Sequence, residues 1–193
     1  CPNDPDVSFG YTQTGQRANA YDARGATEYA YDTRDRLIRK SDPDGLTIEY
    51  TYDAAGNLVS RVSPSQSLVY SYDARNRLET VTRTIDGAPP QLTRYAYDAA
   101  GNRREMQGAD GTRTVAYAYD ALKRLTSEAI THRDPTRNRT STWTYDRVGN
   151  RLTQIVQTAQ GTVGAASAAT QYTYDANDRL TSETTTAGAA TAP

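Results

Sequence analysis

The sequence predicts an all-β protein, an array of about eight β-hairpins that form a continuous, curled antiparallel sheet of solenoid or shell type. Two observations support this fold class. A pair of aromatic residues separated by one residue recurs along the 193-residue chain, and turn-forming residues follow the pairs. A motif that returns at a period of about 20 to 50 residues is typical of an array in which each unit packs on its neighbours.

The aromatic pairs define eight copies of the motif, and every aromatic residue of the chain except Tyr21 belongs to one of them. Two side chains separated by one residue point to the same face of a β-strand, whereas a helix would splay them apart. We therefore expect each pair to end a strand and to pack its rings within the sheet. The pairs are Phe9/Tyr11, Tyr29/Tyr31, Tyr50/Tyr52, Tyr70/Tyr72, Tyr95/Tyr97, Tyr117/Tyr119, Trp143/Tyr145 and Tyr172/Tyr174.

A turn is predicted directly after each pair. The motif continues with Asp, two variable residues and a residue that usually tolerates a left-handed backbone, which suits a type I turn closed by a bulge. The turns of the first copy, where Thr12 replaces Asp, and of the sixth, where Lys123 takes the fourth position, are expected to be the least well specified. The predicted turn residues include Asp32, Asp53, Gly56, Asp73, Asp98, Gly101, Asp120, Asp146, Gly149 and Asp175.

A second strand and a second turn complete each repeat. The expected aliphatic partners of the aromatic pairs are Leu37, Leu58, Leu78, Leu125, Leu152 and Leu180, with Arg103-Arg104 as an exception in the fifth copy. Mid-repeat reversal signals stand at Arg24-Gly25, Asp44-Gly45, Asp86-Gly87 and Asp110-Gly111. Eight such hairpins predict about sixteen strands.

The predicted boundaries are an irregular lead-in over residues 1–8, the repeat array over 9–183 and a flexible tail over 184–193. Longer mid-repeat tips are expected at 86–91, 131–141 and 158–170, and flexibility over 161–170. Cys1 is the only cysteine, and lipidation, an intermolecular disulfide and no special role are all left open for it. Because no Met opens the chain and the array stops within a repeat, we expect a segment of a longer protein or a subunit that meets other copies.

Composition disfavours several classes of partner. The 22 basic residues nearly balance the 23 acidic ones, which disfavours nucleic acid and anionic membranes as partners. No apolar run approaches the roughly 20 residues of a membrane span. The mean hydropathy of -0.80 would indicate disorder in a chain without pattern, but here the repeated tyrosines supply the area to be buried.

Candidate catalytic and metal-binding residues are few. His132 is the only histidine, and a nucleophilic pair with Cys1 would need an orienting group that the sequence does not show. The repeated aspartates are better explained as turn residues than as calcium ligands. We therefore predict no enzyme, with no catalytic residue, no metal site and no cofactor.

Charged residues are also expected to link the turns. Aspartate and arginine four residues apart predict a pair across the turn or a stack of arginine on tyrosine. This spacing occurs in Asp32/Arg36, Asp73/Arg77, Asp120/Arg124 and Asp175/Arg179.

The recurring motif resembles the YD repeat, also called the RHS repeat, over about 180 residues. The blocks Tyr52-Asp53-Ala54-Ala55-Gly56-Asn57-Leu58 and Tyr145-Asp146-Arg147-Val148-Gly149-Asn150-Arg151-Leu152 carry the resemblance most clearly. The family includes Rhs polymorphic toxins, the C component of Tc toxins, wall-associated toxin proteins and teneurins. The resemblance implies a spiralling hollow shell of hairpins that often encloses a toxic domain. Asp42-Pro43-Asp44-Gly45-Leu46 is similar to the autocleavage motif of that family, but its place inside the array favours an ordinary hairpin tip.

Together these features predict a non-enzymatic segment of the β-shell of a secreted or cell-surface bacterial toxin-delivery protein, which encloses or displays a partner domain. The expected partners are other repeats of a longer chain or other copies joined through the sheet edges, and an enclosed toxin domain. The alternative is a self-assembling filament or tube, or an adhesive surface protein that binds carbohydrate through exposed Tyr and Arg. Nucleic acid and a membrane span are not expected.

Overall fold

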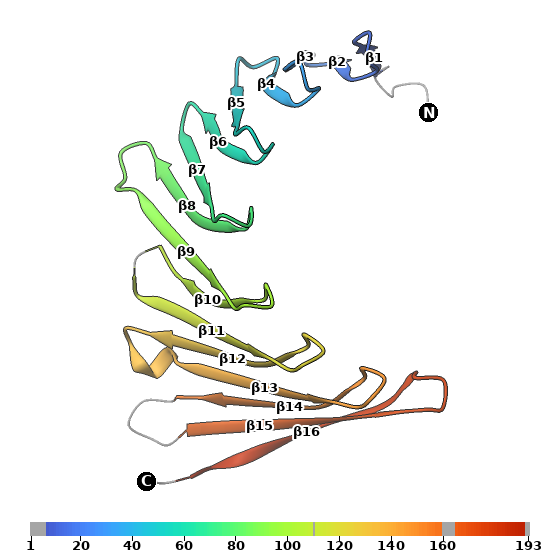
Figure 1. The fold of residues 1–193 in the computed structure, drawn as a ribbon, viewed down its shortest axis with the longest axis vertical. Coiled ribbons are helices and arrows are strands. Elements are labelled where there is room, and N and C mark those ends of the chain that lie inside the picture. Colours follow the sequence, from blue (N-terminus) through green and yellow to red (C-terminus); the bar gives the residue numbers. More distant parts are fainter. Residues whose placement is uncertain (1–6, 110, 160–164, 192–193) are drawn as a thin grey trace. The chain divides into compact units, whose positions relative to one another are not determined.

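The computed structural model of this protein describes residues 7–109, 111–159 and 165–191. The described residues form sixteen β-strands and one short 3-10 helix, so the predicted all-β hairpin array is confirmed. Contacts divide the chain into two units, Cys1–Leu92 and Thr93–Pro193. Within each unit the strands follow one another in chain order and are antiparallel to their neighbours (Figure 1).

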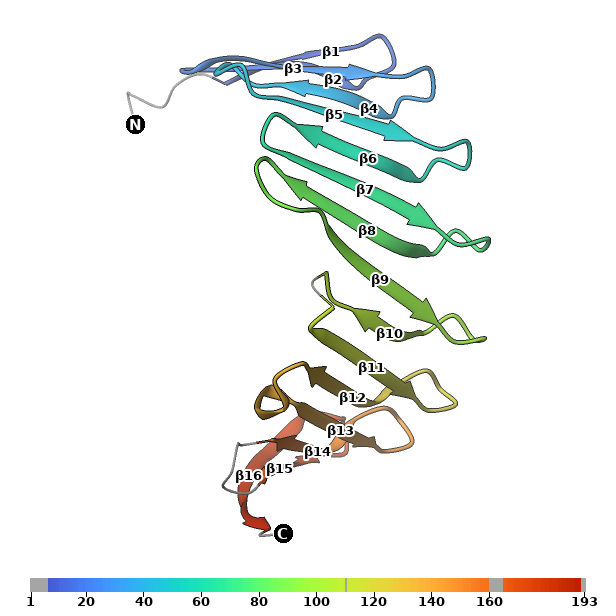
Figure 2. The ribbon, with the colours of Figure 1, turned by 90° about the vertical axis from the view of Figure 1, so that its left-hand side faces the viewer.

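The first unit contains four hairpins. We call the turns that directly follow the aromatic pairs Tyr-Asp turns. In Figure 2 the Tyr-Asp turns of this unit lie along the right-hand side and its mid-repeat turns along the left. Its strands are β1 (Ser8–Tyr11), β2 (Arg17–Asp22), β3 (Gly25–Tyr31), β4 (Leu37–Ser41), β5 (Thr47–Tyr52), β6 (Leu58–Ser63), β7 (Gln66–Tyr72) and β8 (Leu78–Ile85).

The second unit repeats this plan with longer strands. The 3-10 helix η1 (Pro135–Arg137) interrupts the tip between its fourth and fifth strands, and the Asp134 side chain caps this helix by accepting from the Thr136 N–H. The strands are β9 (Gln91–Tyr97), which begins at the boundary between the units, β10 (Arg103–Gln107), β11 (Arg113–Tyr119), β12 (Leu125–His132), β13 (Arg139–Tyr145), β14 (Arg151–Thr158), β15 (Ala165–Tyr174) and β16 (Leu180–Thr191).

Three predicted boundaries differ from the structure. The first strand already begins at Ser8, and the rest of the lead-in, with Cys1, lies outside the described residues apart from residue 7. Residues 165–170 and 184–191, expected to be flexible, belong to β15 and β16 and pair from Gln171↔Thr184 to Ala165↔Thr191. The sequence there is rich in threonine, whose β-branched side chain favours strands, and strand pairing satisfies the backbone.

Seven of the eight Tyr-Asp turns share one pattern of backbone hydrogen bonds, and in the seventh copy the Gly149 N–H donates to Asp146 Oδ1 at 2.7 Å instead of to the carbonyl. In the second copy the Asp32 N–H donates to the Arg36 carbonyl at 2.9 Å and the Asp35 N–H donates to the Asp32 carbonyl at 3.0 Å. Asp35 has a φ of 57°, in the left-handed region. The register shifts between Ala30 and Tyr31, as expected for a bulge. These bonds, the left-handed Asp35 and the register shift agree with the predicted turn closed by a bulge.

The two turns expected to be least well specified share this geometry. The Thr12 turn closes through Thr12 N–H to the Gln16 carbonyl at 2.8 Å. In the sixth copy the Lys123 N–H donates to the Asp120 carbonyl at 2.9 Å, with a φ of 62° at Lys123. At this position lysine adopts the left-handed conformation that glycine, asparagine and aspartate adopt in the other copies.

The leucine prediction fails in the seventh copy. Arg151, not Leu152, lies opposite Tyr145. In the other copies, too, the residue opposite the second aromatic is the sixth after it, as Leu37 is after Tyr31, and Leu152 is the seventh after Tyr145. The side chain of Leu152 is 39% exposed. Arg103 occupies the same position opposite Tyr97. The partner of the second aromatic is thus leucine in some copies and arginine in others.

The two faces of the sheet differ in chemistry. Both aromatics of a pair lie on one face, and the residue between them lies on the other, where it forms hydroxyl pairs such as Thr51 Oγ1 to Ser60 Oγ at 2.6 Å. Among the described residues only Val115 and Ser141 are buried, both on the aromatic face of the second unit. Each unit is therefore a single layer of strands without a separate core.

Replacement of Gly56 by alanine tests the turn geometry. Gly56 has a φ of 97°, and a Cβ added there would meet nothing within 4 Å, so only the backbone conformation is penalised. We expect Gly56→Ala to lower the free energy of unfolding by about 1–2 kcal/mol. Gly56→Asn is the matched control and should cost clearly less, because asparagine tolerates this region. Equal losses in urea unfolding would contradict the assignment.

Candidate functional site

The strongest chemical pattern in the structure lies along the Tyr-Asp turns, which we call the turn row. Each member begins at the second aromatic and ends at the residue opposite it on the next strand. The row consists of residues 11–17, 31–37, 52–58, 72–78, 97–103, 119–125, 145–151 and 174–180. Its side chains connect successive hairpins within each unit.

Tyrosine hydroxyls make the first kind of connection. The Tyr52 hydroxyl donates to the Leu37 carbonyl of the preceding hairpin at 2.9 Å, and the Tyr72 hydroxyl donates to the Leu58 carbonyl at 2.9 Å. That carbonyl belongs to the residue that ends the preceding turn. Burial raises the pKa of the Tyr52 hydroxyl, so it stays protonated and able to donate. The same bond occurs in Tyr31–Arg17, Tyr119–Arg103, Tyr145–Leu125 and Tyr174–Arg151.

Arginine makes the second kind of connection, in what we call guanidinium turns. Arg36 Nε and Nη2 donate to the Asp32 carboxylate at 2.8 and 2.7 Å. Its Nη1 donates to the Asp53 carbonyl of the next turn at 3.2 Å, and the guanidinium carbon lies 4.6 Å from the centre of the Tyr52 ring. One side chain therefore closes its own turn, bonds the next turn and covers the tyrosine that follows.

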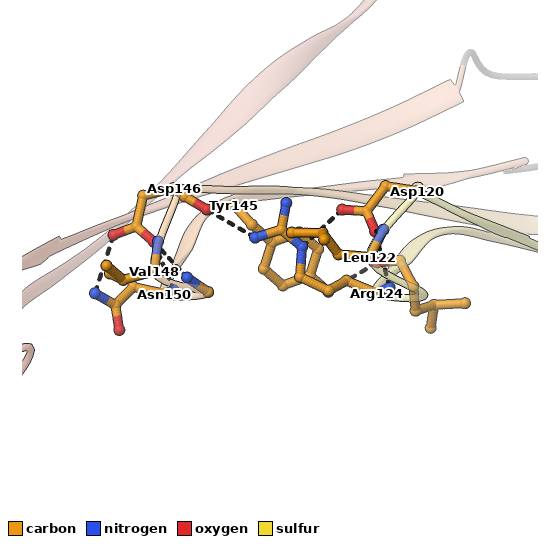
Figure 3. A network of polar contacts seen from close by, with 9 residues as sticks. Asp120, Leu122, Arg124, Tyr145, Asp146, Val148 and Asn150 are labelled. Carbon is orange, nitrogen blue, oxygen red and sulfur yellow. Dashed lines mark hydrogen bonds and ion pairs between the residues drawn. The ribbon is translucent and has the colours of Figure 1, made fainter.

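The second unit contains the same arrangement (Figure 3). Arg124 Nε donates to the Asp120 carboxylate at 2.6 Å, and Arg124 Nη1 donates to the Asp146 carbonyl at 2.7 Å. The guanidinium carbon lies 4.8 Å from the centre of the Tyr145 ring. The predicted aspartate–arginine pairs are confirmed here and in the other three turns where the sequence places them.

Asparagine makes the third kind of connection, in what we call amide turns. Asn57 Nδ2 donates to the Asp53 carboxylate at 2.9 Å and to Asn76 Oδ1 of the next turn at 3.2 Å. Asn150 Nδ2 likewise donates to the Asp146 carboxylate at 2.9 Å and to Asp178 Oδ1 of the next turn at 2.9 Å. The sequence prediction missed these asparagines. The signal was their position, which is the one that arginine occupies in other copies.

The turn aspartates are held ionised. The hydrogen bond from the Arg36 side chain is the main cause that lowers the pKa of Asp32 from 3.8 to about 2, and Arg77 lowers the pKa of Asp73 in the same way to about 2. In the amide turns the hydrogen bond from the Asn57 side chain is the main cause that lowers the pKa of Asp53. These carboxylates serve as acceptors and are poorly suited to proton transfer near neutral pH.

The first aromatics share a face with the second aromatics and also contact arginine. The guanidinium carbon of Arg17 lies 4.5 Å from the centre of the Phe9 ring. Arg103 lies 5.0 Å from the Tyr95 ring and Arg151 5.9 Å from the Tyr172 ring. The remaining first aromatics, Tyr29, Tyr50, Tyr70, Tyr117 and Trp143, are half-buried in their strands.

The other candidates from the sequence form no catalytic group in the part of the chain that the structure describes. His132 ends β12 and lines an open depression with Arg133 and Asp134, and Cys1 lies outside the described residues. No group of three or more His, Cys, Asp or Glu within residues 7–109, 111–159 and 165–191 could hold a metal ion. The Asp42 N–H donates to the Leu46 carbonyl at 2.8 Å, which confirms that this motif is a hairpin tip.

One cavity of about 590 Å³ lies on the aromatic face of the first unit, between the β2–β3 and β4–β5 tips. Its charged walls are already paired. The Arg24 guanidinium binds the Asp22 carboxylate at 2.7 Å, and the Lys40 ammonium binds the Asp42 carboxylate at 2.7 Å.

The fold and the turn row define a β-hairpin repeat protein whose hairpins are joined at Tyr-Asp turns. The family model described as RHS Repeat matches residues 31–68 and 97–131. The chain belongs to this YD/RHS repeat family.

Relatives of this chain include toxin proteins. Toxin protein Tse5 of Pseudomonas aeruginosa is 31% identical over 73% of this chain, and tRNA nuclease WapA of Bacillus subtilis is 32% identical over 75%. Double-stranded DNA deaminase toxin A of Burkholderia cenocepacia is 29% identical over 64%. The matches span 13%, 5% and 10% of those proteins, so the chain corresponds to a small part of each.

Solved structures share the fold. The crystal structure of TcdB2-TccC3-TEV matches 94% of this chain and 13% of its own chain, with a TM-score of 0.67 and 16% identity. The structure of TcdB2-TccC3 without the hypervariable C-terminal region matches 95% of this chain with a TM-score of 0.67. Among the described residues, no helix has the length and apolar character that a membrane crossing requires.

Removal of one hydroxyl tests the first connection. Tyr52→Phe leaves the half-buried Leu37 carbonyl without its donor, and we expect the free energy of unfolding to fall by about 1 kcal/mol. Tyr21→Phe is the control, because Tyr21 lies outside the aromatic pairs and is 49% exposed. Equal losses for the two variants in urea unfolding would contradict this role of the Tyr52 hydroxyl.

Acid should weaken the guanidinium turns. The folded-state pKa of Asp32 and Asp73, about 2, lies below the ordinary value of 3.8, so ionisation of these groups stabilises the fold. This contribution is complete above about pH 4 and is lost as the pH falls towards 2 and below. We expect the melting temperature to fall over that window, and to fall less in Asp32→Asn/Asp73→Asn. Parallel curves for the two proteins in circular dichroism would show that other groups govern acid unfolding.

Proposed function

We propose that this chain is a structural, non-catalytic length of wall in a secreted or cell-surface bacterial toxin-delivery protein, where it encloses or displays a partner domain. The observation that carries the proposal is that each unit is one layer of strands, in which the polar side chains of the turn row form hydrogen bonds with neighbouring hairpins. Such a layer separates the space on its two faces without a core of its own.

The electrostatics of the turn row support a scaffold role. General acid–base catalysis near neutral pH needs groups whose pKa lies near 7. The turn aspartates instead have lowered pKa values and accept bonds from arginine, asparagine and backbone N–H groups. The row therefore fixes the position of each hairpin and contributes no proton donor or acceptor to a reaction.

The relatives support the delivery role. The names of two relatives, double-stranded DNA deaminase toxin A and tRNA nuclease WapA, assign to them deamination of double-stranded DNA and cleavage of tRNA, and this chain matches 10% and 5% of their lengths. We place the catalytic work in parts of such proteins other than the repeats. The purified 193-residue chain should therefore neither deaminate double-stranded DNA nor cleave tRNA, and a turnover in either assay would overturn the non-catalytic assignment.

Protease protection in the native protein tests enclosure. The protein that contains this chain is isolated from its producing cells with an antibody against the repeats, and its intact mass is measured. We expect a mass well above 21.2 kDa and a segment that resists protease until the repeats unfold. A protein of 21.2 kDa that forms fibres under the electron microscope would support the self-assembling alternative instead.

A turn-row variant makes this test specific. Arg124→Ala removes the bonds to the Asp120 carboxylate and the Asp146 carbonyl, so it should admit protease to the enclosed segment sooner. Arg147→Ala is the matched control, because Arg147 lies exposed at the tip of the next turn. Equal rates of digestion in the two variants would contradict a wall that depends on the turn row.

A further inference from the structure

The two kinds of turn alternate without exception along the chain. The fourth turn position, which has a positive φ in every copy, is glycine in odd copies and another residue in even copies: Gly15, Asp35, Gly56, Asn76, Gly101, Lys123, Gly149 and Asp178. The next position is an amide in odd copies and arginine in even copies: Gln16, Arg36, Asn57, Arg77, Asn102, Arg124, Asn150 and Arg179. Leucine always follows the arginine.

Three of the four amide turns present a donor to the turn that follows them. In the third and seventh copies the asparagine Nδ2 reaches the side-chain oxygen of the left-handed residue in the next turn, at 3.2 Å for Asn57 to Asn76 and 2.9 Å for Asn150 to Asp178. In the first copy Thr14 Oγ1 donates to Asp35 Oδ1 at 2.9 Å. A glycine at that position in the following turn would offer no side-chain acceptor.

The fifth copy shows the same junction with donor and acceptor exchanged. Lys123, the left-handed residue of the sixth turn, donates through Nζ to the Ala100 carbonyl of the fifth turn at 3.3 Å. Glycine in the sixth turn could not make this bond either. The step from an amide turn thus depends on a side chain at the left-handed position that follows.

A guanidinium turn presents the opposite surface. Its arginine bonds the aspartate carbonyl of the next turn and covers the next tyrosine, in Arg36 on Asp53 and Tyr52 and again in Arg124 on Asp146 and Tyr145. The side chains of Arg36 and Arg124 are 25% and 26% exposed. Arg179, after which the described residues contain no further turn, is 76% exposed. The following turn therefore supplies the cover.

We infer that each Tyr-Asp turn is a recognition surface for a turn of the other type, so that the unit of assembly is a pair of hairpins. A guanidinium turn next to another one leaves the second turn's left-handed side chain without its amide donor. If two amide turns were adjacent, the first would meet a glycine in place of a side chain at the left-handed position of the second. No arginine would then cover the tyrosine of the second turn. The partner that fits behind a guanidinium turn is a hairpin with a Tyr-Asp-x-x-Gly-Asn turn, whichever chain supplies it.

Two internal deletions test this inference, because the length of the chain and the alternation of turn types predict opposite orders of their melting temperatures. Deletion of residues 53–72 joins Tyr52 to Asp73 and places two guanidinium turns side by side. Deletion of residues 32–72 joins Tyr31 to Asp73, removes one hairpin more and keeps the alternation. We expect the shorter chain to have the higher melting temperature. The reverse order, or equal melting temperatures, would overturn the inference.

A variant of full length decides the matter if neither deletion folds. Gly56→Asn/Asn57→Arg converts the third turn into a guanidinium turn between two others, and we expect the unfolding equilibrium constant to rise by about fivefold through the lost bond to Asn76. Asn76→Asp is the control, because it keeps the turn type and the acceptor. A double variant as stable as this control would overturn the inference.

Discussion

The aspartate that opens seven of the eight turns is the group on which the rest of the array depends. In the second copy one Asp32 carboxylate oxygen accepts from the backbone N–H groups of Arg34 and Arg36, and the other accepts from the Arg36 side chain. The carboxylate thereby fixes the turn and orients the side chain that reaches the next hairpin. A local turn and a contact between repeats are parts of one hydrogen-bonded group.

This arrangement explains how an antiparallel sheet persists with little burial. The only buried side chains in the described ranges are Val115 and Ser141, so the hydrophobic effect of a closed core contributes little. Strand pairing, half-buried aromatic rings and the turn row supply the cohesion in its place. Within each unit, neighbouring hairpins contact one another, so stability is distributed along the strands as in other repeat proteins.

Much of this could be predicted from the sequence because it is local. The period-two aromatics and the aspartate-led turns predicted the hairpins, and the four-residue spacing of Asp32 and Arg36 predicted their pair. The position of Leu152 was wrong because it stands seven residues after Tyr145, whereas the residue that faces the tyrosine is the sixth after it. The strand in 184–191 was missed because its order depends on pairing with β15, a contact that composition does not reveal.

The alternation of turn types also bears on how such chains lengthen. Duplication of one hairpin would place two surfaces of the same type together, whereas duplication of two adjacent hairpins would reproduce every junction already present. Recombination between two copies would be tolerated best when both are odd-numbered or both are even-numbered. The repeat number of such genes would then change in steps of two, and insertions would collect at the mid-repeat tips, where no turn-row contact is disturbed.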